Sequence, residues 1–129
     1  MKDTPRNVLD TGEFSVSVVV AEATERMDHT AADPADDSDE FELAGIPRAS
    51  CERVDAPYVA DSPITMECEL ADSQEIAGRT MIVGDVVHFR VAEDAMRDGQ
   101  VDSREITTVG RLGGPYYTHA TPVSFERRY

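Results

Sequence analysis

The sequence predicts a strand-rich fold, mostly β or α+β with short helices. Segments 14–20 and 64–70 alternate apolar and polar residues, which is typical of strands with one buried face. A third stretch, 79–92, is long enough for a bent or barrel-forming strand, and Gly84 near its middle permits the bend. Strands that are not separated by long helices argue against a βαβ architecture.

Short helices are expected beside these strands. Thr4 suits the N-cap of a first helix, Pro5 its first position and Gly12 its end. Further short helices are expected at about 22–27 and 39–44.

The remaining segments predict loops and one last strand. Residues 46–63 carry three prolines and are expected to follow the surface, with a short extended piece at 51–54. Residues 71–78 are expected to connect two strands, and 116–125 to add a final, interrupted strand. Three convincing strands do not close a barrel, so a second subunit or a missing segment would have to cover the exposed edges.

Composition excludes several classes of partner. The chain has 129 residues, which favours one domain, and 26 acidic against 12 basic residues give a formal charge of −14. Such a chain repels nucleic acid and anionic membrane surfaces, so neither is expected as a partner. The longest apolar run, 18–21, is too short for a signal peptide or a membrane span, and a cytoplasmic protein with reduced thiols is expected.

No metal or catalytic constellation is apparent. Cys51 and Cys68 lack a CxxC spacing and the three histidines are scattered, so no zinc site is expected. His88 is interpreted as a packing residue, and the pair Glu67 and Glu69 as a solvated acidic strand face. No serine is accompanied by a His/Asp arrangement, and no catalytic side chain is assigned.

Two segments could contact an anionic or aromatic ligand. Lys2 and Thr4 lie at a predicted helix start, where N–H groups attract phosphate, although Asp3 adds repulsion and a plain helix cap is the default explanation of Thr4. Arg111 could pair with a phosphate or carboxylate, and Tyr116 or Tyr117 could stack on an aromatic ring. The alternative for the second segment is a turn whose tyrosines pack at an edge or subunit interface.

Five short motifs in order resemble one family, the flavin reductase-like, FMN-binding split-barrel proteins. These motifs are KDT at 2–4, DEFELAG at 39–45, SPITMECEL at 62–70, VGDVVHF at 83–89 and GRLGGPYY at 110–117. The resemblance implies a split β-barrel with Greek-key character, and a homodimer with FMN near the subunit interface. It also implies hydride transfer from NAD(P)H to flavin, often in support of a partner monooxygenase.

The same resemblance suggests roles for individual residues. It implies that Lys2 and Thr4 lie beside the FMN phosphate, and that Arg111, Tyr116 and Tyr117 contact the cofactor or the subunit interface. Flavin carries the hydride itself, so the absence of an acid–base constellation does not count against an enzyme.

The chain also departs from the family pattern. Family members carry further N-terminal strands, so residues 1–129 are expected to form a single domain that is N-terminally incomplete. Two alternatives follow: a non-catalytic split-barrel subunit or remnant that dimerises without turnover, and a small module that binds another anion at the helix start of Thr4.

The charged residues predict a dependence of stability on salt. Lys2 is the only lysine beside eleven arginines, and a surface rich in carboxylates is typical of adaptation to high salt, the alternative being an ordinary acidic protein. We expect the fold to be lost in dilute buffer and kept in molar KCl, because dense counterions screen the repulsion among carboxylates. Circular dichroism across a KCl series measures this, and an intact fold in dilute buffer would contradict it.

Overall fold

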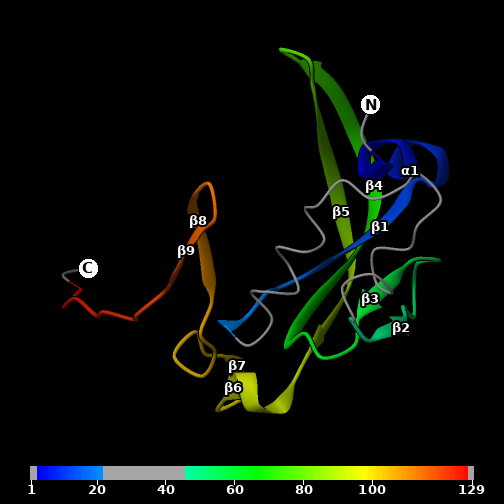
Figure 1. The fold of residues 1–129 in the computed structure, drawn as a ribbon. Helices are drawn as coiled ribbons and strands as arrows, with labels where there is room; N and C mark the ends of the chain where they lie inside the picture. Colours follow the sequence, from blue (N-terminus) through cyan, green and yellow to red (C-terminus); the bar gives the residue numbers. More distant parts are fainter. Residues whose placement is uncertain (1–2, 22–45, 128–129) are drawn as a thin grey trace.

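The computed structural model describes residues 3–21 and 46–127, and its centre is an antiparallel sheet (Figure 1). Three strands form this sheet in the order β1-β4-β5, namely β1 (Glu13–Ser17), β4 (Ile64–Ile76) and β5 (Arg79–Val91). The described part of the chain is mostly β with one short α-helix, so the predicted fold class is confirmed. The helices expected at 22–27 and 39–44 lie outside the described residues.

The helix α1 (Asp3–Thr11) leads directly into β1. It begins one residue before the expected cap, so Thr4 lies in its first turn and is exposed. It ends as predicted at Gly12, which has a φ of 74° and donates its N–H to the carbonyl of Val8 over 2.7 Å. Gly12 then accepts a hydrogen bond of 2.8 Å from the N–H of Leu70, which ties the helix end to β4.

Strands β4 and β5 form one long hairpin, and β4 is longer than expected. Residues 71–76, predicted as a connection, form the second half of β4. The turn is the pair Ala77 and Gly78, both at positive φ (49° and 77°), which is the geometry of a tight two-residue hairpin. Register shifts follow Glu67 and Leu70 in β4, and Leu70 pairs with Gly84, so the predicted bend lies where that glycine stands.

Three smaller hairpins complete the described chain (Figure 1). Their strands are β2 (Arg48–Ser50) with β3 (Pro57–Val59), β6 (Met96–Arg97) with β7 (Gln100–Val101), and β8 (Val109–Gly113) with β9 (Tyr116–His119). A 3₁₀ turn, η2 (Glu93–Ala95), precedes β6. The extended piece expected at 51–54 was wrong, because those residues belong to the loop between β2 and β3. The last strand, predicted at 116–125, begins where β9 begins but was predicted too long, because β9 ends at His119.

Charged groups support the connection through β6 and β7. The carboxylate of Asp102 lies 2.6 Å from Nη2 of Arg104 and 3.8 Å from Nε of Arg97. Side-chain and backbone hydrogen bonds from Arg104 hold the pKa of Asp102 well below its usual range. Arg97 also pairs with Glu105. Arginine–carboxylate pairs thus link the residues of this connection, beside Ala95 of η2, which is fully buried.

The strand register separates the central sheet into two chemically different faces. One face is apolar and the other is polar, because paired residues share a face and successive residues alternate. The apolar rows are Phe14–Cys68–Val86 and Val16–Met66–Phe89, and the polar row between them is Ser15–Glu67–His88.

The polar face is the one that the β2–β3 hairpin covers. Ser15 donates its hydroxyl to the carbonyl of Pro57 over 2.6 Å, and the N–H of Val59 donates to Oγ of Ser17 over 3.2 Å. Beneath the hairpin Thr65 and Glu67 are fully buried, each at 0% exposure. Polar hydrogen bonds thus hold the hairpin on the sheet.

The apolar face requires a glycine at position 84. A Cβ on Gly84 would lie 2.5 Å from Cζ of Phe14 and 3.2 Å from Cβ of Cys68. Phe14 therefore packs directly over the Gly84 backbone, in space that no other residue type leaves free.

We expect Gly84→Ala to lower the free energy of unfolding by about 1–2 kcal/mol, because the Phe14 ring has to swing away. Denaturant unfolding in molar KCl measures the change. The double variant Phe14→Leu/Gly84→Ala is the control, since removal of the ring should make the alanine almost harmless. Equal stability of Gly84→Ala and the parent protein would contradict this packing.

Candidate functional site

The start of α1 is the first of the two predicted contact regions. Thr4 lies exposed in the first turn, where backbone N–H groups have no partner within the helix and favour anions. Its hydroxyl is available beside those groups. Lys2, predicted as the second cation contact, lies outside the described residues. The described part of this region is therefore compatible with a phosphate at the helix start, with Thr4 as the available hydroxyl.

The β8–β9 hairpin brings the other three predicted residues together. The Arg111 guanidinium lies 5.6 Å from the centroid of the Tyr117 ring, and its Nη2 donates to the carbonyl of Gly114 over 3.3 Å. Arg111 is thus oriented by its own hairpin. Tyr116 points elsewhere and is 69% exposed, whereas Tyr117 is half-buried. The exposed Tyr116 ring can meet an aromatic partner, and the oriented Arg111 guanidinium can meet an anionic one.

One chain does not bring the two predicted regions together. The β8–β9 hairpin and the tail beyond it stand apart from the central sheet, and α1 lies at the other side of the molecule (Figure 1). Thr4 is therefore separated from Arg111, Tyr116 and Tyr117. A single ligand that touched both regions would need contributions from more than one copy of this chain.

A buried carboxylate, which the sequence interpretation missed, lies on the polar face of the sheet. Glu67 accepts hydrogen bonds from the N–H of Arg53 (2.6 Å) and the N–H of Glu52 (3.1 Å), one on each carboxylate oxygen. Burial alone would raise the pKa of Glu67, but these N–H donors and the nearby charge of His88 lower it below the ordinary value. The prediction of a solvated acidic face was therefore wrong for Glu67, while Glu69 is exposed as predicted.

A cluster of charged side chains lies beside this buried carboxylate. Glu52 reaches Nε2 of His88 at 3.3 Å and Nη2 of Arg90 at 3.5 Å. The Arg90 guanidinium also lies 4.7 Å from the centre of the Tyr58 ring, a cation–π contact between β5 and β3. His88 thus contributes to docking of the β2–β3 loop, which agrees with its interpretation as a packing residue.

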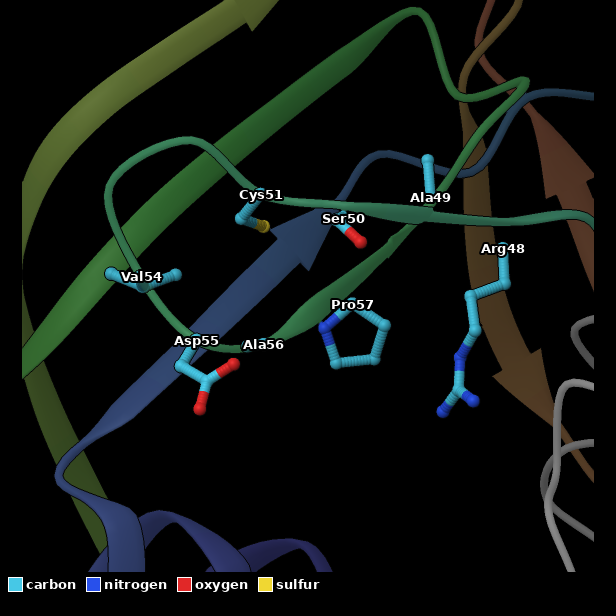
Figure 2. Close-up of a pocket in the computed structure, with 8 residues that line it drawn as sticks. All are labelled: Arg48, Ala49, Ser50, Cys51, Val54, Asp55, Ala56 and Pro57. Atoms are coloured by element: carbon cyan, nitrogen blue, oxygen red, sulfur yellow. The ribbon is translucent and has the colours of Figure 1, made fainter.

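The same loop borders an open pocket of about 250 Å³ (Figure 2). Its lining comes from β2, β3 and the loop between them, namely Arg48, Ala49, Ser50, Cys51, Val54, Asp55, Ala56 and Pro57. In Figure 2 the Arg48 and Asp55 side chains lie on opposite sides of Pro57. Burial and the negative charge of Glu67 raise the pKa of the Cys51 thiol, so this cysteine is held protonated and is a poor nucleophile.

Neither a metal site nor a membrane-spanning helix is found among the described residues. Among residues 3–21 and 46–127, no group of three His, Cys, Asp or Glu side chains is arranged to hold a metal ion. No helix in those ranges is long and apolar enough to cross a membrane.

One signal in the sequence could have revealed the buried carboxylate. Ser15 and Ser17 alternate in β1 just as Thr65 and Glu67 alternate in β4, so both strands carry a polar row. Matching these rows across a sheet would have placed Glu67 among hydroxyl groups. The donors themselves come from a loop 14 and 15 residues away, which no local pattern indicates.

The arrangement of helix, sheet and hairpins agrees with comparisons to known proteins. The flavin reductase like domain matches residues 1–109. The chain belongs to this family. The family resemblance predicted from the five motifs is therefore confirmed.

Solved structures extend this family assignment to the fold. Nitrilotriacetate monooxygenase component B from Bacillus cereus is similar at 30% identity and a TM-score of 0.90, over 98% of this chain and 65% of its own. A Shewanella frigidimarina protein described with a split barrel domain shares 25% identity at a TM-score of 0.86, over 98% and 65% of the two chains. These two similar structures confirm the predicted split-barrel fold.

Curated relatives are longer than this chain. An uncharacterized protein from Halalkalibacterium halodurans is 34% identical over 122 residues, which cover 90% of this chain and 58% of the relative. One from Deinococcus radiodurans is 36% identical over 129 residues, covering 97% and 56%. The chain thus spans somewhat more than half the length of the curated relatives it matches.

Replacement of the buried carboxylate tests how the β2–β3 loop is held. We expect Glu67→Gln to cost roughly 2–3 kcal/mol of unfolding free energy, because an amide N–H₂ would face a backbone N–H donor. Since the folded-state pKa of Glu67 is lowered, its contribution is present above the ordinary glutamate value of about 4.3 and is lost as pH falls through the lower folded value.

Unfolding of both proteins across that acidic range, in molar KCl, measures this contribution. The matched control is Glu69→Gln, two residues along the same strand and exposed. Amide hydrogen exchange at Glu52 and Arg53 should quicken in Glu67→Gln and stay unchanged in the control. If the two variants are equally stable, Glu67 does not hold the loop.

Proposed function

We propose that this protein is an FMN-binding, flavin reductase-like oxidoreductase that accepts hydride from NAD(P)H on its flavin. The observation that carries the proposal is the family match over residues 1–109. Bound flavin supplies the redox chemistry, and the chain supplies binding, orientation and access. This division of work fits a chain in which no catalytic acid–base group has been assigned.

The start of α1 is proposed to hold the FMN phosphate. Thr4 offers a hydroxyl in the first turn of a nine-residue helix, and the helix dipole favours an anion there. Lys2, two residues earlier, adds a positive charge in a chain of formal charge −14. Elsewhere on so acidic a surface a phosphate would be repelled, which makes this helix start the favoured position.

The remaining proposed contacts come from β8 and β9. Arg111, Tyr116 and Tyr117 are proposed to meet the cofactor or the subunit interface of a homodimer. Tyr116 is 69% exposed, so its ring is available to a partner surface. A dimer is also supported by the exposed apolar residues of the central sheet, among them Phe89 at 62% exposure.

The name of one structural neighbour supports a proposal about the wider reaction. That neighbour is component B of a nitrilotriacetate monooxygenase. By analogy, this protein would supply reduced flavin to a separate monooxygenase, in the cytoplasm, where NAD(P)H is available. The chain matches 65% of that neighbour, so this activity is proposed for the assembled protein.

A non-catalytic split-barrel subunit is the alternative. The separation of α1 from the β8–β9 hairpin in one chain favours it, because the proposed flavin contacts are then incomplete within a monomer (Figure 1). Such a subunit would dimerise and take up no flavin. Colour separates the two functions, since a purified flavoprotein absorbs in the flavin bands.

Titration with FMN and with riboflavin tests the proposed site. We expect the parent protein to bind FMN in molar KCl, and Lys2→Ala/Thr4→Ala to weaken FMN roughly tenfold, about 1.4 kcal/mol, while riboflavin is little affected. Only FMN carries the phosphate. Asp10→Ala, at the other end of the same helix, is the control and should bind both ligands as the parent does.

Equal losses for the two ligands would contradict the phosphate role. A colourless protein that takes up neither flavin would favour the non-catalytic subunit. Bleaching of bound flavin under anaerobic conditions by NADH or NADPH then tests hydride transfer directly.

A further inference from the structure

Two successive backbone N–H groups of the β2–β3 loop converge on one buried carboxylate. The N–H of Arg53 donates to Oε1 of Glu67 over 2.6 Å, and the N–H of Glu52 donates to Oε2 over 3.1 Å. We call these two N–H groups the amide pair. Each carboxylate oxygen thus has its own donor, and Glu67 is 0% exposed. Backbone N–H groups that converge in this way form an anion-binding arrangement.

The surroundings of the amide pair favour an ionised occupant. Although burial alone would raise the pKa of Glu67, the N–H donors of the loop and the nearby charge of His88 lower it below the ordinary value. The carboxylate of Glu52 is turned toward β5, where it lies 3.3 Å from Nε2 of His88 and 3.5 Å from Nη2 of Arg90. Side chains of β5 therefore meet the charge of Glu52, and the amide pair receives a different carboxylate.

The contacts with the amide pair are made by the two terminal oxygens of Glu67 alone. Its Cβ and Cγ act as a tether that joins this carboxylate to β4. Truncation of Glu67 to alanine removes the Cγ methylene and the carboxylate, which together correspond to one acetate ion. The variant would leave two N–H donors without an acceptor, and an unsatisfied buried donor costs more than the hydrogen bond gains.

We propose that the amide pair is a carboxylate-binding site in its own right, which Glu67 occupies as a built-in ligand. A free carboxylate of the size of acetate binds there when the carboxylate of Glu67 is removed. The β2–β3 loop is then docked by anion binding, and the tether to β4 raises the effective concentration of the anion. The site involves neither α1 nor the β8–β9 hairpin, so it is independent of the proposed flavin contacts.

Hydrogen exchange at the amide pair in Glu67→Ala tests this site. At neutral pH, potassium acetate replaces KCl stepwise at constant potassium concentration. In KCl we expect the protection of the Glu52 and Arg53 amides to fall about tenfold below that of the parent protein, and acetate to restore most of it along a saturable curve. Propionate should restore much less, because its extra methylene has no room where the parent side chain is 0% exposed.

Three controls separate anion binding from other effects of acetate. Acetamide has nearly the same shape without the charge and should restore no protection. Glu67→Gln fills the space with its own amide and should not respond to acetate. Glu69→Ala removes an exposed carboxylate from the same strand, and its amide pair should be equally protected in KCl and in acetate.

Several outcomes overturn the proposal. One is that acetate restores no protection, and another is that acetamide restores as much, which would mean that any molecule filling the cavity suffices. An equal gain in Glu69→Ala also overturns it, because acetate would then act as a stabilising salt. If Glu67→Ala does not fold in KCl, circular dichroism across the same acetate series replaces hydrogen exchange: recovery of the fold supports the site, and no recovery overturns it.

Discussion

The buried carboxylate of Glu67 holds the β2–β3 hairpin on the polar face of the central sheet. Its two oxygens accept the N–H groups of Glu52 and Arg53, and with Ser15 and Ser17 they bind the β2–β3 hairpin to the polar rows of β1 and β4. Because strand side chains alternate, this docking directs Phe14, Val16, Met66 and Cys68 to the opposite face. A sheet whose polar side is buried at a hairpin must bury its apolar side against something else. Docking of the hairpin on the polar face therefore leaves the apolar face for other packing partners.

Acidic composition acts on the same sheet through its register. Glu13, Glu69 and Asp85 are direct neighbours across β1, β4 and β5, so three carboxylates stand in one row. Like charges directly opposite each other destabilise a sheet. Glu13 is partly compensated, because its Oε2 accepts the N–H of Asp55 over 2.6 Å. Among the described residues no ion pair is found for Glu69 or Asp85. Counterions in solution would screen this row, which is the physical basis of the expected dependence of stability on salt.

Much of the fold, but less of the site, could be predicted from the sequence. The helix end at Gly12 and the alternation at 64–70 are local signals, and both were correct. The second half of β4 was missed because residues 72–75 are polar and mostly exposed, and only their pairing with β5 makes them a strand. Glu67 was misjudged for a related reason: in a chain this acidic, a glutamate in an alternating strand resembles any surface glutamate. Its burial depends on N–H groups of a distant loop, which alternation does not report.

For the proposed cofactor contacts too, local sequence patterns indicate single segments but not how those segments lie relative to one another. Thr4 was recognisable because helix starts have local signatures, and Arg111 with Tyr116 and Tyr117 because they stand in one short motif. Neither segment's sequence indicates that the two lie far apart in space. A flavin that needs a phosphate site and a ring site can use both only where two surfaces of this chain, or two copies of it, approach each other.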